Sequence, residues 1–154
     1  MKGHFNICQL IIENVEEINS SENKHGNTPL AYAVQNDHYE ICKLLVENLK
    51  DKSSVSTNGF SPLHYVTLSW APLYYRGYYD LCKFLIDNVA DKNPSNDWGQ
   101  TPLHIAAEKG FVEICQLLIQ NAPDKNPSNK YGQTPMHCAF KNGFLATGWP
   151  EISK

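Results

Sequence analysis

Long apolar runs are missing from this sequence of 154 residues. No stretch has the roughly 20 consecutive apolar residues that a membrane-spanning helix requires. The N-terminal residues also lack the apolar core, roughly 7–15 residues long, on which a secretory signal depends. We therefore expect an intracellular protein, in the cytoplasm or the nucleus, that does not bind a membrane.

Clusters of positive charge are missing too. The 13 Lys and Arg residues are outnumbered by 16 Asp and Glu, the formal net charge is -3, and no run of basic residues occurs. Proteins that bind nucleic acid or an acidic membrane surface concentrate positive charge on one face. The charge pattern therefore argues against nucleic acid as a partner.

Motifs for chemistry are also scarce. None of the five cysteines forms the C-x-x-C pair that is typical of zinc sites. No carboxylate pair, glycine-rich phosphate loop or nucleophile motif accompanies the six histidines. We therefore expect no catalytic residue, no cofactor and no metal site, and we predict that the protein is not an enzyme.

Two phrases recur along the chain in a common register. The first reads Thr/Ser-Pro-Leu/Met, followed by His in three of its copies. It begins at Thr28, Ser61, Thr101 and Thr134, so the intervals are 33, 40 and 33 residues. The second phrase is an apolar run around a cysteine, and it spans Phe5–Ile11, Tyr39–Leu45, Tyr79–Leu85 and Val112–Leu118. A fixed period of this length indicates a solenoid of repeated units.

The unit is clearest between residues 96 and 129. Pro102 suits the first position of a helix, where its missing N–H would have no partner, and Thr101 before it can cap the helix. We expect Gly110 to end this short helix in a left-handed conformation. A second helix with an apolar face is predicted over about residues 111–120. The residues that match Gly110 in the other units are Asp37, Gly77 and Gly143.

The phrase Thr101-Pro102-Leu103-His104-Ile105-Ala106-Ala107, with its 33-residue period, resembles the signature of the ankyrin repeat. The resemblance covers nearly the whole chain. It implies an all-α solenoid, in which hairpin-like turns join pairs of antiparallel helices. On this basis residues 1–154 form one domain, with a half repeat (1–22), three full repeats (23–55, 56–95 and 96–128) and an incomplete last repeat (129–154).

The cysteines fit this scheme as packing residues. One recurs per unit at the same point of the second helix, where stacked units would hold the residues roughly 10 Å apart, beyond the reach of a disulfide. A buried cysteine that forms no disulfide behaves as a small hydrophobic residue. The four are Cys8, Cys42, Cys82 and Cys115, and Cys138, which aligns with Ile105, is interpreted in the same way.

The histidines of the first phrase are His64, His104 and His137. In the ankyrin family this ring hydrogen-bonds the turns of neighbouring repeats, so the resemblance implies a structural role. Asn93 and Asn126 are similar to sites that asparagine hydroxylases modify in ankyrin repeats. The alternative is a turn asparagine that satisfies backbone groups before proline.

The resemblance places a partner protein in the concave groove, which the turn tips and the exposed sides of the first helices line. Trp98 and Tyr131 take equivalent tip positions in adjacent repeats, and such aromatics are typical binding anchors. The alternative is that the two rings pack on each other and stiffen the tips. The other candidates in this groove are Lys24, His25, Asn27, Asn58, Phe60, Asp97, Gln100, Glu108, Lys109, Lys130 and Gln133.

The third repeat is seven residues longer than its neighbours, and the extra residues lie within the stretch 69–76. This insertion is rich in aromatics for a loop, a composition that often marks an interaction site. Its candidate binding residues are Trp70, Tyr74 and Tyr75. The alternative is a loop that folds back over its own helices.

Together these features predict a non-catalytic protein–protein interaction module, acting as a monomeric adaptor, scaffold or inhibitor. The alternative is a truncated fragment of a longer ankyrin array with no independent activity. The chain opens in a half repeat, and Gly148 and Pro150 interrupt the last one, so both terminal units are irregular.

Overall fold

The computed structural model describes residues 2–16, 18, 28–36, 38–50, 52, 55–68 and 76–146. Helix is the only regular secondary structure in these residues. The helices are α1 (Lys2–Asn14), α2 (Pro29–Gln35), α3 (Tyr39–Asn48), α4 (Pro62–Leu68), α5 (Arg76–Asn88), α6 (Pro102–Lys109), α7 (Val112–Asn121) and α8 (Pro135–Ala146). None of them is long and apolar enough to cross a membrane.

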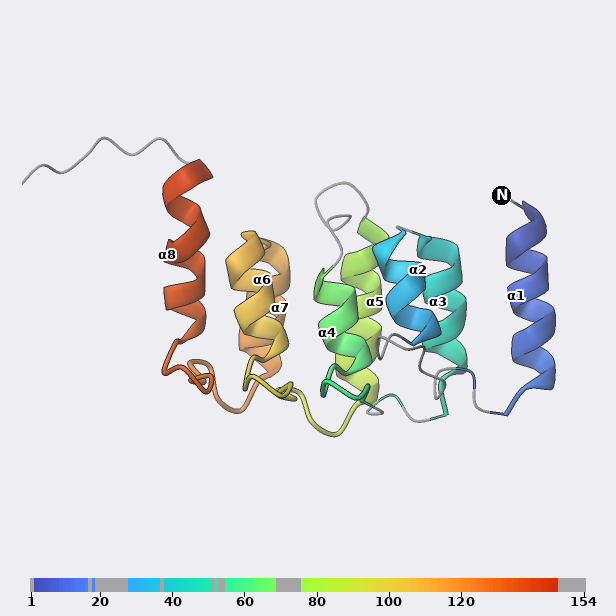
Figure 1. The fold of residues 1–154 in the computed structure, drawn as a ribbon, viewed down its shortest axis with the longest axis horizontal. Coiled ribbons are helices and arrows are strands. Elements are labelled where there is room, and N and C mark those ends of the chain that lie inside the picture. The colour runs from blue at the N-terminus through green and yellow to red at the C-terminus, as the bar shows by residue number, and fades with distance from the viewer. Residues whose placement is uncertain are drawn as a thin grey trace, which may run out of the picture.

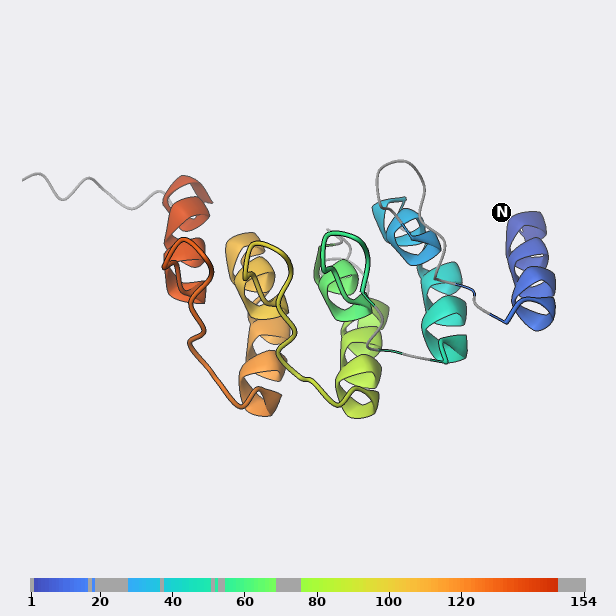
Figure 2. The same cartoon turned by 60° about the horizontal axis from the view of Figure 1, so that its bottom comes forward.

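The helices form an elongated array with α1 at one end and α8 at the other (Figure 1). One layer holds the first helices of the units, α2, α4, α6 and α8, and each contacts the next. The second layer holds α1, α3, α5 and α7 in the same order (Figure 2). Within a unit, α2 packs on α3, α4 on α5 and α6 on α7. The expected all-α solenoid is thus confirmed.

The Thr/Ser-Pro phrase sets the start of each first helix. A proline occupies the first position of α2, α4, α6 and α8. Ahead of α2, the Thr28 hydroxyl accepts a hydrogen bond from the Ala31 N–H at 3.3 Å, which satisfies one unpaired donor of the first turn. At the other end of α6, Gly110 takes the predicted left-handed conformation, with φ +73°.

The predictions for two other glycines were wrong. Gly77 does not end a first helix, because α5 already begins at Arg76. A Cβ on Gly77 would overlap the Tyr39 ring, so the glycine makes room for an aromatic side chain of α3. Gly143 lies inside α8, which continues to Ala146. A helix tolerates an internal glycine at a cost of about 1 kcal/mol. The third matching residue, Asp37, lies outside the described residues.

The core lies between the two layers of helices. Leu63 and Leu103 enter it from the first helices, and Leu85 and Ile86 enter it from α5. Cys82 is also fully buried there, and burial raises the pKa of its thiol to about 12. All five cysteines of the chain are thiols rather than disulfides. The protonated Cys82 side chain therefore packs as a small apolar group.

Candidate protein-binding surface

The turn before α6 is held by the side chain of Asn96. Its Oδ1 accepts hydrogen bonds from the N–H of Trp98 at 3.0 Å and of Gln100 at 2.9 Å. The Asn96 N–H in turn donates to the Gln100 carbonyl at 2.9 Å, and Gly99 closes the turn with φ +73°. The backbone that carries Trp98 is therefore fixed by several hydrogen bonds.

The turn before α8 repeats this geometry. Asn129 Oδ1 accepts from the N–H of Tyr131 at 2.9 Å and of Gln133 at 2.9 Å, and Gly132 has φ +71°. In the turn before α4 a serine replaces the asparagine: the Phe60 N–H donates to Ser56 Oγ at 3.2 Å. Trp98 and Tyr131 thus lie at equivalent positions of two turns with nearly identical backbones.

Backbone hydrogen bonds also join each tip to the next. The Asp97 N–H donates to the Asn58 carbonyl at 3.1 Å, and the Lys130 N–H donates to the Trp98 carbonyl at 3.0 Å. The tips come forward side by side on one side of the array (Figure 2). These bonds make the three tips one continuous surface rather than three separate loops.

The histidines tie each first helix to the following tip. The Ser61 N–H donates to His64 Nδ1 at 3.1 Å, so this nitrogen carries the lone pair and the ring proton lies on Nε2. Nε2 then donates to the Gln100 carbonyl, 2.9 Å away in the next turn. His104 repeats the arrangement, with Nδ1 3.0 Å from the Thr101 N and Nε2 3.0 Å from the Gln133 carbonyl. The predicted bonding between neighbouring turns is confirmed for these two rings.

Burial keeps these rings neutral. It lowers the pKa of His64 from its ordinary value of 6.5 to about 4, although the hydrogen bond to the Gln100 carbonyl opposes the shift. Burial also lowers the pKa of His104. Both ring nitrogens of each histidine are hydrogen-bonded, so each side chain links a first helix to the following tip. We call His64 and His104 the histidine struts. His137 keeps the first bond, from the Thr134 N–H at 3.2 Å, but its ring is exposed.

An aromatic cluster lies beneath Trp98. The Phe60 ring meets the Trp98 ring edge-on, with centroids 5.9 Å apart, and stacks on the Tyr65 ring at 5.6 Å. Phe60 stands where the next two tips have Gln100 and Gln133, and it is only half-buried. Its contacts identify Phe60 as a support for Trp98, a relation that the sequence pattern did not show.

The two tip aromatics differ in exposure. Trp98, whose ring contacts Phe60, is 40% exposed, whereas Tyr131 is 70% exposed. A ring with this much exposed area at a hydrogen-bonded tip is available for contact with another protein. Trp98 also has a packing role, although the ring it packs on is Phe60 of the preceding tip.

Polar residues border these rings at the tips, and two further candidates lie at the opposite end of α6. Asp97, Lys130 and Asn58 are exposed at the tips, while Glu108 and Lys109 are half-buried at the end of α6. Burial lowers the pKa of Lys109, and the nearby Glu108 carboxylate raises it. Gln100 and Gln133 are half-buried, and their side-chain Oε1 atoms accept from Asn96 and Asn129. The border carries charges of both signs.

Six of the predicted binding residues lie outside the described residues. They are Lys24, His25 and Asn27 of the second unit and Trp70, Tyr74 and Tyr75 of the insertion. The turns of Asn93 and Asn126 are described: their N–H groups donate to Asp91 Oδ1 at 2.8 Å and to Asp124 Oδ1 at 2.9 Å. The aspartates thus satisfy backbone donors in these turns.

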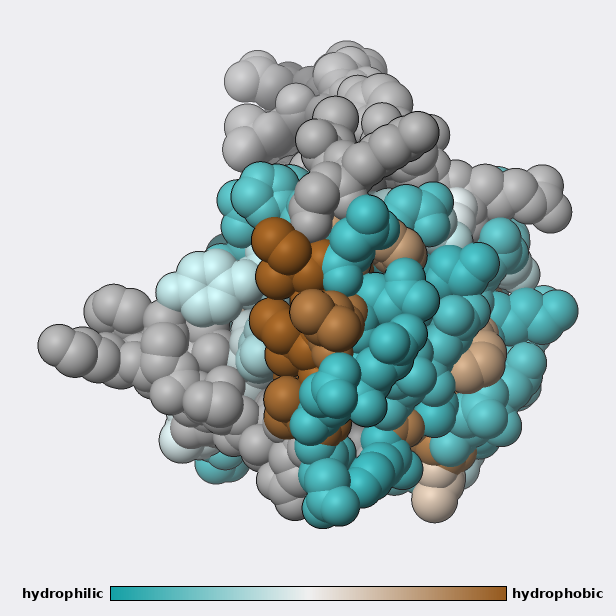
Figure 3. Space-filling view, turned by 90° about the vertical axis from the view of Figure 1, so that its right-hand side faces the viewer, coloured by the Kyte–Doolittle hydropathy of each residue, from teal (hydrophilic) through white to brown (hydrophobic). Residues whose placement is uncertain are grey.

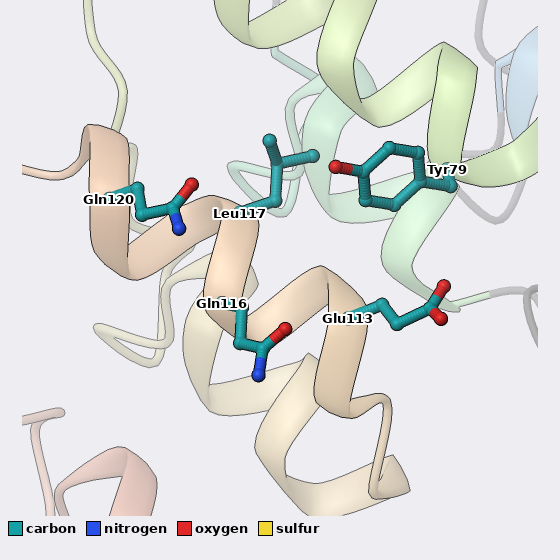
Figure 4. Close-up of a pocket in the computed structure, with 5 residues that line it drawn as sticks. All are labelled: Tyr79, Glu113, Gln116, Leu117 and Gln120. Atoms are coloured by element: carbon teal, nitrogen blue, oxygen red, sulfur yellow. The ribbon is translucent and has the colours of Figure 1, made fainter.

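A pocket on the second layer was not predicted. It measures about 290 Å³, and Tyr79 of α5 lines it together with Glu113, Gln116, Leu117 and Gln120 of α7. The Tyr79 hydroxyl points toward the Leu117 side chain (Figure 4). No sequence pattern indicates this pocket, because α5 and α7 meet only when the repeats stack. Within the described part of the chain, no group of three or more His, Cys, Asp or Glu side chains could hold a metal ion.

Stacked helix pairs, hydrogen-bonded tips and histidine struts define a helical-repeat protein. The sequence matches the family described as ankyrin repeats (3 copies) over residues 1–71 and 68–147, and the chain belongs to this family. Ankyrin repeats are generally protein-interaction modules. None of the curated proteins matches the sequence.

The tip glycines offer a matched test of the contact between tips. Gly99→Ala and Gly132→Ala both force alanine into a left-handed conformation, which costs about 1–2 kcal/mol. Only at Gly99 would the new Cβ also lie 2.8 Å from the backbone N of Lys130, whereas at Gly132 it meets nothing within 4 Å. In urea unfolding, Gly99→Ala should lose about 1 kcal/mol or more beyond the loss in Gly132→Ala. Equal losses would mean that the tips are not in close contact.

The histidine struts predict a pH dependence of stability. The pKa of His64 is about 4 in the folded chain and returns to about 6.5 on unfolding, so the unfolded state binds more protons between these values. The stabilising contribution of the neutral His64 ring is complete above pH 6.5, and about 3 kcal/mol of unfolding free energy is lost as the pH falls to 4.

Urea unfolding at several pH values would measure this effect. His64→Gln should flatten the dependence of the unfolding free energy on pH between 4 and 6.5. The matched control is His137→Gln, at the equivalent place in the last repeat, where the ring is exposed. An unchanged slope in His64→Gln would contradict the role assigned to its burial.

Proposed function

We propose that the chain is a non-catalytic binding module that holds a partner protein against its turn tips and the exposed sides of its first helices. The observation that carries the proposal is the pair Trp98 and Tyr131, displayed at equivalent positions of two hydrogen-bonded turns. Aromatic side chains on a rigid backbone give contact area with little loss of conformational entropy on binding.

The border around the rings supports the same function. Asp97 and Lys130 stand beside Trp98 and Tyr131 and carry opposite charges. An apolar centre inside a polar border is the usual composition of a protein interface, and such charges select the partner more than they add affinity. An adaptor, a scaffold and an inhibitor would all use a surface of this kind.

Catalysis is not part of the proposal, for two reasons. The family consists generally of interaction modules. In addition, both nitrogens of the buried His64 and His104 rings are engaged in hydrogen bonds. A general base needs a nitrogen that can reach the substrate proton, and these rings offer none.

Truncating the tip aromatics tests the proposal. The wild-type chain, the Trp98→Ala/Tyr131→Ala double variant and a control would each be immobilised to capture proteins from a cell extract, with quantification by mass spectrometry. The control is Val112→Ala, which removes an exposed apolar side chain from α7 in the other layer. The captured amount of a specific partner should fall at least about tenfold in the double variant, because losing two anchors of about 1–2 kcal/mol each accounts for that factor. It should be retained by the control.

Stability must be measured on the same variants. Tyr131→Ala should leave the unfolding free energy nearly unchanged, whereas Trp98→Ala should lower it by about 0.5–1.5 kcal/mol through loss of the Phe60 contact. If neither aromatic affects the capture of any protein, the alternative of an array segment without a partner of its own is favoured.

A further inference from the structure

The end of the array formed by α1 exposes an apolar strip. It consists of Ile7, Leu10 and Ile11, which are all exposed. Half-buried Cys8 and Ile12 lie on a different side of α1. Viewed from this end of the array, the surface shows a band of hydrophobic residues with hydrophilic ones along one side (Figure 3). We call these three residues the head face.

The repeat register shows what normally covers such residues. Ile11 matches Leu85 of α5, yet Ile11 is 51% exposed and Leu85 is 0% exposed. Ile7 likewise matches Leu81 and Ile114, which are both buried. In the inner units the first helix of the same unit covers these positions, α4 on α5 and α6 on α7. Among the described helices, α1 has the position of a second helix, and no first helix of its own unit is paired with it.

The opposite end of the array, formed by α7 and α8, also exposes apolar residues. Met136 and Phe140 on α8 and Ile119 on α7 are exposed apolar residues, and we call these three the tail face. Met136 is 66% exposed, whereas the matching Leu103 of α6 is 2% exposed. Ile119 matches Val46 and Ile86, which are both buried. In the described residues α8 is a first helix with no second helix packed on it, and the uncovered positions are those that a second helix would cover.

We propose that copies of this chain associate head to tail, with α1 of one copy packed as a second helix against α8 and α7 of another. The two helices then complete one repeat between two chains. Each face supplies what the other lacks, and the contact continues the stacking that already joins α6 to α7 and α5 to α7. The occupant of the tail face is therefore a second copy of this chain, which departs from the monomer expected from the sequence.

The symmetry of this contact has a measurable consequence. Two different faces meet, so the association is heterologous and can continue from copy to copy instead of stopping at a dimer. A chain with a damaged head face keeps its tail face, and the reverse also holds. Two such variants cannot associate with themselves, but mixed together they can form one contact.

Leu10→Asp and Phe140→Asp provide the two variants. Both residues are exposed, so the isolated chains should fold, which circular dichroism would confirm. Sedimentation velocity from micromolar to submillimolar concentration should show the wild-type mass rising with concentration. Each variant alone should remain at the monomer mass, since a charge buried in the contact weakens it about tenfold or more. An equimolar mixture should reach the dimer mass and go no further.

The control is Val55→Asp, which places the same charge on an exposed apolar residue between α3 and α4, outside both faces, and should associate like the wild type. Leu10→Gln and Phe140→Gln repeat the test with neutral side chains that a helix accepts. The proposal is overturned by a wild type that stays monomeric or by a variant that self-associates normally. It is equally overturned by a mixture that remains monomeric or by a control that behaves like the face variants.

Discussion

Each helix pair in this chain has two apolar sides and can cover neither alone, and the rest of the structure depends on that constraint. Leu85 and Ile86 of α5 are buried because α4 packs on their helix within the unit and α3 and α7 flank it. Burying a leucine or isoleucine side chain contributes about 1.5–3 kcal/mol, so stability comes chiefly from contacts between neighbours. The exposed residues at the two ends are the direct consequence of the same constraint.

The histidine struts carry this packing out to the tips. His64 is fixed in the core by Ser61, yet its Nε2 reaches the carbonyl of Gln100 in the next turn. The position of one tip is thus set by the helix of the preceding unit, and the bonds between tips align the backbone of Trp98 with that of Lys130. A regular scaffold therefore determines where the variable tip side chains stand.

The sequence predicted the parts of the fold that depend on local chemistry. The Thr/Ser-Pro pair of each phrase located the first helices, and the resemblance to the ankyrin family implied the histidine bonds between units. From the chemistry of its residues alone, the sequence could not predict contacts that arise only when units stack. Phe60 occupies a position where the pattern has glutamine, and its place under Trp98 depends on the distance between two tips. Gly77 fits a helix-ending pattern, but its role is set by the Tyr39 ring of another helix.

Amide hydrogen exchange of the chain in dilute solution tests most directly whether neighbour contacts hold the array together. Among the described helices, α4, α5 and α6 contact helices on both sides, whereas α1 and α8 have a neighbour along the array on one side only. Exchange should therefore be slowest in these three central helices and fastest in α1 and α8. A single common rate for all helices, or central helices that exchange before the ends, would contradict the account.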